Sequence, residues 1–323
     1  MFIAGRHLEN IDINRDGGVL VVSSNLTGQI WDGGLNYFSD STNIECTLYQ
    51  THLSKHMPAS TADGCWCAPD SVVVGTDNGH LQVFTLDNGF FVDSCHLLSH
   101  HSYVTSLSVT CSSAHCVSGG GDGCVNIADL NEMRLISKYH THSEIVNRVN
   151  THNSSPDLFA SCSMDGSVLI YDMRKSQPAR RISITDAVVT AVNYHGDKLA
   201  VGTEAGQLLV KDMRGGTTPL KEANDHCRSI RRIVFCPSRS SWIATGGEDG
   251  VVSVLQYDLL NTQSIYMSEN HSDFVTGLVW NSEELISCSW DSTVQKHCIT
   301  NEVLAGEPHA VNGHCSLPPS CCD

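Results

Sequence analysis

The chain has few charged residues, few cations and no long apolar run. Only 17% of its 323 residues are charged, and 19 lysines and arginines against 35 acidic residues give a formal net charge of −16 at pH 7. Nucleic acid is bound through basic surfaces, so this balance argues against it as a direct partner. An acidic surface instead attracts basic partners such as Arg- and Lys-rich tails. Because no apolar run approaches membrane-spanning length, we expect no membrane association.

Targeting and disulfide patterns are also lacking. The start of the chain, Met1 to Arg6, is too short for a signal sequence. Fifteen cysteines are present, but they fall singly in strand-like stretches such as Phe159 to Cys162, where a reduced thiol packs as a small hydrophobe. We therefore expect a cytoplasmic and nuclear location.

No motif for catalysis or cofactor binding is found. Gly119 to Gly121 runs into an Asp-Gly turn, so it belongs to a hairpin and not to a phosphate-binding loop. Cys65 and Cys67 are separated by one residue, whereas zinc knuckles use two. His52 and His56 have helical spacing but lie in a loop-like stretch. We expect no enzyme activity, no cofactor and no metal site.

What the chain does contain is a repeat. Seven short turns, each followed by an apolar run, are centred on Gly33, Gly79, Gly123, Gly166, Gly206, Gly250 and Ser292. The gaps between them are 46, 44, 43, 40, 44 and 42 residues. A period in the low forties with Asp-Gly turns and strand-like flanks is typical of WD repeats, each of which forms one blade of a β-propeller.

The fourth repeat shows why each unit should form a blade. Apolar stretches run from Ile145 to Val149, from Leu158 to Cys162 and from Val168 to Asp172. The turn Met164-Asp165-Gly166 separates the last two and supplies the positive φ of a tight hairpin. We predict an all-β, seven-bladed WD-repeat β-propeller over residues 1–306, with a disordered tail over 307–323. Either Met1 to Ala4 or the stretch after Asn301 should supply the outer strand of the last blade.

A histidine precedes the turn aspartate at a similar distance in four repeats. The pairs are His101 with Asp122, His142 with Asp165, His226 with Asp249, and His271 with Asp291. A catalytic or metal-binding interpretation of one pair would not explain its recurrence. We interpret the pairs as structural hydrogen bonds that tie the loop before each blade to its turn. The repeats at Gly79 and Gly206 lack the histidine and should be held by packing alone.

The first repeat departs from the others. After a strand over 19–24, six extra residues lead to Trp31-Asp32-Gly33, whereas most other repeats carry a small or charged residue two positions before the turn glycine. We expect a lengthened hairpin that projects from one face with Trp31 near its tip. Exposed tryptophan is a common anchor at protein interfaces; the alternative is that Trp31 folds back onto its own blade.

The segment from Ser23 to Phe38 resembles the first blade of the methylosome WD-repeat subunits, the family of methylosome protein fifty. The last repeat is similar as well, through His271 to Val275, Trp280 and Trp290-Asp291. The resemblance implies a non-catalytic adaptor in a complex with the type II, symmetrically dimethylating protein arginine methyltransferase, assembled as four propellers around four methyltransferases. It also implies that the adaptor helps to present Arg-rich substrates such as histones and Sm proteins.

The same resemblance suggests which residues contact the methyltransferase. It implies that Trp31 inserts into an apolar pocket on the N-terminal barrel domain of the enzyme, with Ile30, Asp32 and Gly33 beside it. Tyr266 matches a second aromatic position of the family.

Two other interpretations remain open. Tyr171-Asp172-Met173-Arg174 and Lys211-Asp212-Met213-Arg214 end adjacent repeats, as Trp-Asp-x-Arg motifs do in substrate receptors of cullin-type ubiquitin ligases. A histone-binding propeller is the other alternative.

Overall fold

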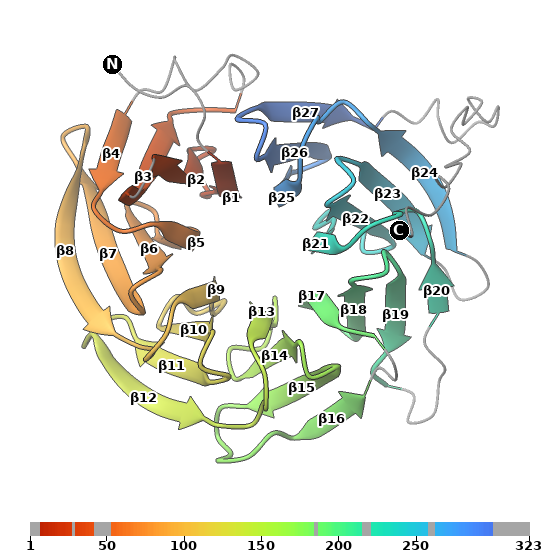
Figure 1. Ribbon diagram of the computed structural model, residues 1–323, viewed down its shortest axis with the longest axis horizontal. Coiled ribbons are helices and arrows are strands. Elements are labelled where there is room, and N and C mark those ends of the chain that lie inside the picture. Colours follow the sequence, from red (N-terminus) through yellow and green to blue (C-terminus); the bar gives the residue numbers. More distant parts are fainter. Residues whose placement is uncertain are drawn as a thin grey trace, which may run out of the picture.

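The fold is a ring of seven antiparallel sheets, as predicted. The computed structural model describes residues 7–27, 30–41, 53–183, 187–214, 221–257 and 262–299, in which every regular element is a strand. Figure 1 shows the sheets arranged like blades around a central axis, with their first strands innermost. No helix in the described ranges is long and apolar enough to cross a membrane.

The first four sheets each contain four strands. Blade 1 consists of β1 (His7–Ile13), β2 (Val19–Thr27), β3 (Ile30–Phe38) and β4 (Leu53–Met57). Blade 2 consists of β5 (Thr61–Ala68), β6 (Ser71–Thr76), β7 (His80–Asp87) and β8 (Phe90–Leu98). Blade 3 consists of β9 (Val104–Val109), β10 (His115–Gly120), β11 (Val125–Asp129) and β12 (Arg134–Tyr139). Blade 4 consists of β13 (Val146–Thr151), β14 (Leu158–Ser163), β15 (Ser167–Asp172) and β16 (Arg180–Ser183).

The remaining three sheets complete the ring. Blade 5 consists of β17 (Val189–His195), β18 (Lys198–Thr203), β19 (Leu208–Asp212) and β20 (Lys221–Ala223). Blade 6 consists of β21 (Ile230–Phe235), β22 (Trp242–Gly247), β23 (Val252–Tyr257) and β24 (Thr262–Ser268). Blade 7 has three strands in the described residues, β25 (Val275–Asn281), β26 (Glu284–Ser289) and β27 (Val294–Cys298). Both segments expected to supply its outer strand, and the expected tail, lie outside the described residues.

The core is divided among the contacts between neighbouring blades. Seven hydrophobic clusters are found, and each joins two adjacent blades; for example, Val168 of blade 4 packs in one cluster with Leu199 of blade 5. Strand β15 is buried along its whole length because sheets cover both of its faces. Burying apolar area on both faces of every middle strand is the main stabilisation of such a ring.

Blades 1 and 7 meet through noncovalent contacts that close the ring. Leu8 and Val21 share a hydrophobic cluster with Ile286, and Thr276 Oγ1 donates a hydrogen bond to the backbone oxygen of Leu8 at 2.5 Å. At the same seam His7 stacks on Trp290, with ring centroids 4.6 Å apart.

Six of the seven predicted turns have the backbone that the sequence requires. Gly79, Gly123, Gly166, Gly206, Gly250 and Ser292 all adopt positive φ, between 67° and 84°. The seventh prediction is wrong, because Gly33 lies inside β3 and has no positive φ. The β2–β3 pairing continues beyond it to Thr27 and Ile30, so the chain reverses farther along than the Asp-Gly pattern suggested.

Candidate functional site

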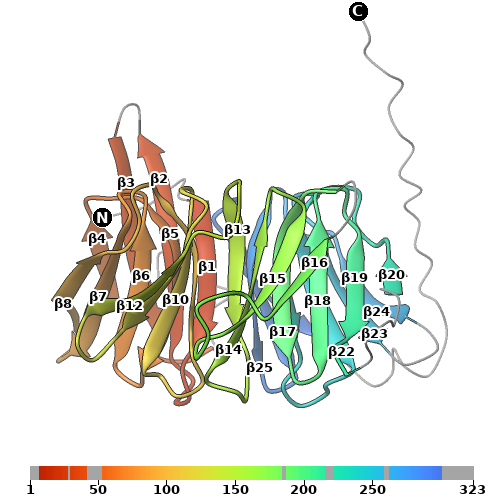
Figure 2. The same ribbon diagram turned by 90° about the horizontal axis from the view of Figure 1, so that it is seen from below.

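The β2–β3 hairpin of blade 1 extends beyond the other turns of its face. Its antiparallel pairing continues past the Ser24–Gly33 pair through Asn25–Asp32 and Leu26–Trp31 to Thr27–Ile30. Figure 2 shows this hairpin standing clear of the disc, whereas the corresponding turns of other blades stay level with it. The lengthened hairpin expected from the sequence is therefore present, with Trp31 in strand β3 and not in a turn.

The base of the hairpin is packed against the start of blade 2. A Cβ atom added to Gly33 would lie 2.6 Å from both the Ala59 backbone oxygen and Thr61 Cγ2, so only glycine fits this close approach. Thr61 Oγ1 donates a hydrogen bond to the Ser23 backbone oxygen at 2.7 Å. On the other side, Ser24 Oγ bonds to a carboxylate oxygen of Glu9 in β1. These contacts hold the two strands in a defined direction where they leave the disc.

Asp32 provides a further brace within blade 1. Its Oδ2 atom lies 3.1 Å from Nε2 of His56, which occupies the neighbouring strand β4. The pair is more exposed than the His–Asp pairs at the blade turns, because more than half of the His56 side chain is open to solvent. His52, which was considered together with His56 as a possible metal pair, lies outside the described residues.

Trp31 is the largest exposed side chain on the hairpin. It is 56% exposed to solvent, which rules out the alternative that it folds back onto its own blade. Ile30 begins β3 and pairs with Thr27, but its side chain lies outside the described part of the structure. An indole presented in this way can bury about 150–250 Å² against a partner.

Tyr266 is not brought together with Trp31. It lies in β24 of blade 6, and blade 7 stands between that strand and the hairpin (Figure 1). Its hydroxyl lies 3.0 Å from Nδ1 of His297 in β27, and its ring packs edge-on against the same imidazole. The side chain is half-buried and links blades 6 and 7.

Three of the four predicted His–Asp pairs are present as expected. His142 Nδ1 lies 3.0 Å from Asp165 Oδ2, His226 Nδ1 lies 3.0 Å from Asp249 Oδ1, and His271 Nδ1 lies 2.9 Å from Asp291 Oδ2. The imidazoles are buried. In each pair the aspartate also accepts a hydrogen bond from the backbone amide of the residue after the histidine.

The fourth pair was assigned to the wrong histidine. His100 Nδ1, not His101, lies 2.9 Å from Asp122 Oδ1, and His101 is exposed and supplies only its backbone amide to Asp122 Oδ2 at 3.2 Å. The spacing to the following strand explains this result. In the other pairs the histidine precedes the first residue of the inner strand by four positions, and the same count back from Val104 gives His100.

A buried hydroxyl completes each pair, and the sequence interpretation missed it. The second ring nitrogen, Nε2, contacts a hydroxyl at 2.7 to 2.9 Å in all four blades. The hydroxyls belong to Ser118, Ser161, Thr245 and Ser287. Each stands five positions before its turn residue, whereas the two repeats without the histidine have valine there, Val74 and Val201. This difference was visible in the sequence and identifies a buried network that is either complete or replaced by apolar packing.

In blades 4 and 7 the network reaches the position where other WD repeats carry tryptophan. Tyr171 OH lies 3.2 Å from Ser161 Oγ, and His297 Nε2 lies 2.8 Å from Ser287 Oγ. Burial, together with repulsion from His271, lowers the pKa of His297 to about 4. This imidazole is therefore neutral at pH 7 and serves only as a hydrogen-bonding group.

In the pairs of blades 3 and 4 a neutral imidazole lies beside an ionised carboxylate. Burial lowers the pKa of His100 and of His142 and outweighs the attraction of their aspartates. Burial also pushes the pKa of Asp122 upward, but hydrogen bonds from His100 and from two backbone amides outweigh it and lower the pKa to about 2. A pair of this kind acts as a structural clamp, because the buried imidazole joins the turn aspartate to a buried hydroxyl of the same blade.

The two Asp-Met-Arg segments form matching ion pairs on adjacent blades. Arg174 donates from Nε and Nη2 to the two oxygens of Asp172, at 2.8 and 2.7 Å. Arg214 does the same with Asp212, at 3.1 and 2.6 Å. Both arginines remain mostly exposed.

Among the described residues no group of three or more His, Cys, Asp or Glu side chains could hold a metal ion.

The ring, the His–Asp clamps and the projecting hairpin together define a seven-bladed WD-repeat β-propeller. A family model described as "WD domain, G-beta repeat" matches residues 133–172 and 262–296. The chain is similar to Methylosome protein WDR77 of Xenopus laevis, with 28% identity over 298 residues that cover 89% of this chain and 88% of that protein. The resemblance to the methylosome WD-repeat subunits is therefore confirmed along nearly the whole length of both chains.

Other WD-repeat proteins are similar too. GATOR2 complex protein Wdr24 of Drosophila melanogaster is 25% identical over 305 residues, which cover 90% of this chain and 38% of that protein. Guanine nucleotide-binding protein subunit beta of Saccharomyces cerevisiae is 23% identical over 241 residues, which cover 61% of this chain and 56% of that protein. These matches reflect the shared propeller.

Proposed function

We propose that this protein is the non-catalytic adaptor subunit of a protein arginine methyltransferase complex and that it binds the N-terminal barrel domain of a type II methyltransferase. The observation that carries the proposal is Trp31, a tryptophan 56% exposed on a projecting hairpin whose base is braced on both sides. The end-to-end similarity to a protein named for the methylosome supports the choice of partner.

The bracing of the hairpin favours a binding role for Trp31. Association is weakened when flexible segments must be ordered, and a side chain held in place before contact avoids that entropic cost. Gly33 and Asp32 belong to the bracing and not to the contact itself, because their neighbours are Thr61 and His56 of the same chain. Trp31 is then the residue that enters an apolar pocket of the partner.

The proposal extends to the assembly and its substrates. Four propellers surround four methyltransferases, and the adaptor helps to present Arg-rich proteins such as histones and Sm proteins in the cytoplasm and the nucleus. The formal net charge of −16 supports this role, since an acidic surface draws basic tails toward the enzyme by long-range attraction.

The test compares the binding of wild type and Trp31→Ala to a purified type II arginine methyltransferase by calorimetry. Truncating a central aromatic anchor costs about 2–4 kcal/mol, so the dissociation constant should rise by about 30- to 1000-fold. Phe90→Ala is the matched control, because Phe90 is an exposed aromatic residue on the outer strand β8. Unchanged binding by Trp31→Ala, or equal losses in both variants, would contradict the assignment.

The matching ion pairs at Asp172 and Asp212 favour one alternative function. Both present an exposed arginine at the end of the third strand of adjacent blades, as expected for a substrate receptor of a cullin-type ubiquitin ligase. Affinity purification from native lysate, with partners identified by mass spectrometry, separates the two functions. A ligase adaptor that is lost in the Arg174→Ala variant and retained in Trp31→Ala would favour the alternative.

A further inference from the structure

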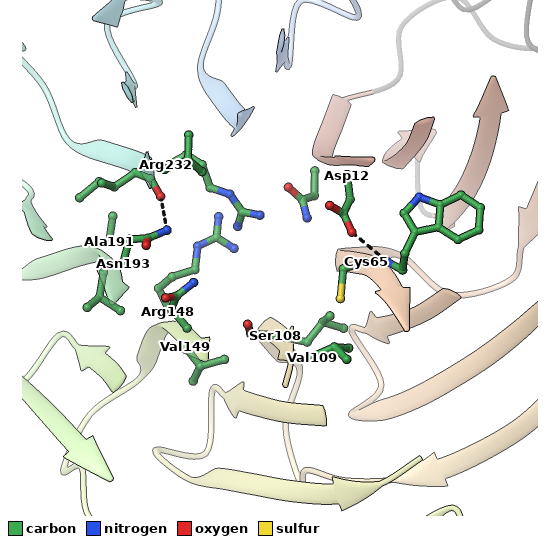
Figure 3. A pocket seen from close by; sticks show the side chains of 16 residues that line it. Asp12, Cys65, Ser108, Val109, Arg148, Val149, Ala191, Asn193 and Arg232 are labelled. Atoms are coloured by element: carbon green, nitrogen blue, oxygen red, sulfur yellow. Dashed lines mark hydrogen bonds between the residues drawn. The ribbon is translucent and has the colours of Figure 1, made fainter. Parts of the chain in front are cut away.

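The axis of the propeller contains a polar cavity that the adaptor function does not use. It has a volume of about 230 Å³ and is lined by residues of β1, β5, β9, β13, β17 and β21. Figure 3 shows the side chains of Arg148 and Arg232 entering the cavity from one side, with Asp12 on the opposite side. The space corresponds to several water molecules, each of which occupies about 30 Å³ in the liquid.

One buried carboxylate, that of Asp63, lies within 4 Å of both guanidinium groups. Asp63 Oδ2 lies 2.9 Å from Nη1 of Arg148 but 3.8 Å from Nη1 of Arg232. The same oxygen also accepts hydrogen bonds from Leu107 N and Ser106 Oγ, at 3.0 and 3.1 Å. Asp63 is fully buried and has little accepting capacity left.

Arg148 and Arg232 therefore retain donors that Asp63 cannot satisfy. Each guanidinium carries five N–H groups in a planar fork. Burial, reinforced by repulsion from Arg232, lowers the pKa of Arg148 to about 10. An additional anion between the forks would relieve this repulsion and accept their hydrogen bonds.

The carboxyl group of Asp12 also lines the cavity, opposite the two arginines (Figure 3). Its two oxygens accept hydrogen bonds from the backbone amides of Ile13 and Trp66, both at 2.9 Å. Each carboxylate oxygen can accept a further hydrogen bond. A bound group that carries an acidic O–H can therefore donate to Asp12 while its other oxygens accept from the arginines.

We propose that the axial cavity binds a small phosphate-class anion that retains an acidic O–H, either inorganic phosphate or a phosphate monoester. Its P–O oxygens accept hydrogen bonds from Arg148 and Arg232, and its P–OH group donates to the carboxyl of Asp12. An ionised carboxylate ligand would satisfy the arginines but could not donate to Asp12. Sulfate has the shape and charge of phosphate but carries no proton near neutral pH.

The test is calorimetric titration of the full chain with inorganic phosphate, with sulfate, and with a simple phosphate monoester such as glycerol 2-phosphate. Phosphate should bind at least tenfold more tightly than sulfate, because only phosphate can donate to the carboxyl of Asp12. The stronger ligand among phosphate and the monoester identifies the source of the group. Equal binding of phosphate and sulfate, or no binding of either, would overturn the proposal without any variant being made.

Arg232→Gln is the variant of choice, since Arg148→Gln would break the buried ion pair with Asp63. Phosphate affinity should fall at least tenfold. Arg228→Gln removes the same charge from an exposed position over Phe274, with 5.3 Å between the guanidinium carbon and the ring centroid, and should leave the affinity unchanged. Equal losses in both variants would indicate nonspecific attraction and overturn the site. The outcome is independent of Trp31 and of methyltransferase binding.

Discussion

Blade 1 and blade 4 use an Asp-Gly pair in opposite ways. In blade 4, Asp165 lies at the tight turn before Gly166 and accepts hydrogen bonds from buried His142 and from the amide of Ser143. In blade 1, Asp32 lies within strand β3 and contacts the exposed ring of His56. The first arrangement holds the disc together, whereas the second supports a hairpin that leaves it.

The difference shows how a repeat protein can separate stability from recognition. Four blades keep the His–Asp–hydroxyl network, and the two blades with valine at the hydroxyl position, Val74 and Val201, replace it by packing. Blade 1 has neither arrangement at its turn, because its hairpin continues beyond the point where the others reverse. The ring therefore tolerates an extended hairpin in one blade, since each blade is held mainly by its two neighbours.

We expect the largest effect from a variant in which blade 1 has a turn like that of blade 4. Replacing residues 25–32 by Asn-Gly would join Ser24 to Gly33, which already pair across the hairpin, through a two-residue turn. Methyltransferase binding should fall by more than about 1000-fold, because Trp31 and its strand are removed together. Circular dichroism should show that the rest of the sheet structure is retained.

The control for this variant is the melting temperature. The His56 side chain of the Asp32–His56 pair is 56% exposed, so loss of the pair should change the free energy of unfolding by less than about 1 kcal/mol. A shortened variant that keeps its affinity for the methyltransferase would show that the hairpin is not the contact surface.

The sequence predicted the repeats and turns well for a physical reason. A tight Asp-Gly hairpin needs positive φ at the glycine, and the six turns from Gly79 to Ser292 adopt it. At Gly33 the same dipeptide stands inside a strand. There glycine is required by the close approach of the Ala59 backbone oxygen, a contact between distant segments that no local pattern reveals.

The histidine network was only partly predictable from the chain. Spacing from histidine to aspartate cannot separate the neighbours His100 and His101, because the distance varies among the repeats. The spacing from the histidine to the inner strand distinguishes His100 from His101. It is constant because the same clamp fixes both the loop conformation and the start of the strand. The axial cavity could not be predicted, because Arg148, Arg232 and Asp12 meet only when the ring closes.

The His–Asp clamp of blade 3 can be tested for its contribution to stability. His100→Ala removes a fully buried imidazole that contacts Asp122 and Ser118 at 2.9 Å. The free energy of unfolding should fall by about 2–4 kcal/mol, since a cavity and unpaired polar groups are created together. Chemical denaturation measures this change directly.

His101→Ala is the matched control for His100→Ala. The side chain of His101 is exposed, and its backbone amide still donates to Asp122 in the variant. The free energy of unfolding should change by no more than about 0.5 kcal/mol. Equal destabilisation by the two substitutions would contradict the assignment of the clamp to His100.

The smallest expected effect is a pH dependence from His297, where the clamp of blade 7 extends to a second imidazole. Its pKa is lowered to about 4 in the folded chain, first by burial and then by repulsion from His271, against about 6.5 when unfolded. Because the folded-state pKa is the lower one, the neutral ring contributes its full stability above pH 6.5. That contribution is lost as the pH falls toward 4, since the unfolded chain binds the proton first.

Between pH 7 and pH 5 this single group should lower the free energy of unfolding by about 2 kcal/mol. His297→Gln keeps a side chain that can bond to Ser287 but cannot titrate, so its stability should vary less with pH by about that amount. Denaturation of both proteins at pH 7 and pH 5 measures the difference. His101→Gln serves as a control, because an exposed histidine has nearly the same environment folded and unfolded. Equal loss of stability by wild type and His297→Gln on acidification would contradict this prediction. The imidazole of His297 would then be hydrated in the folded chain, and the clamp of blade 7, unlike those of the other blades, would be open to water at His297.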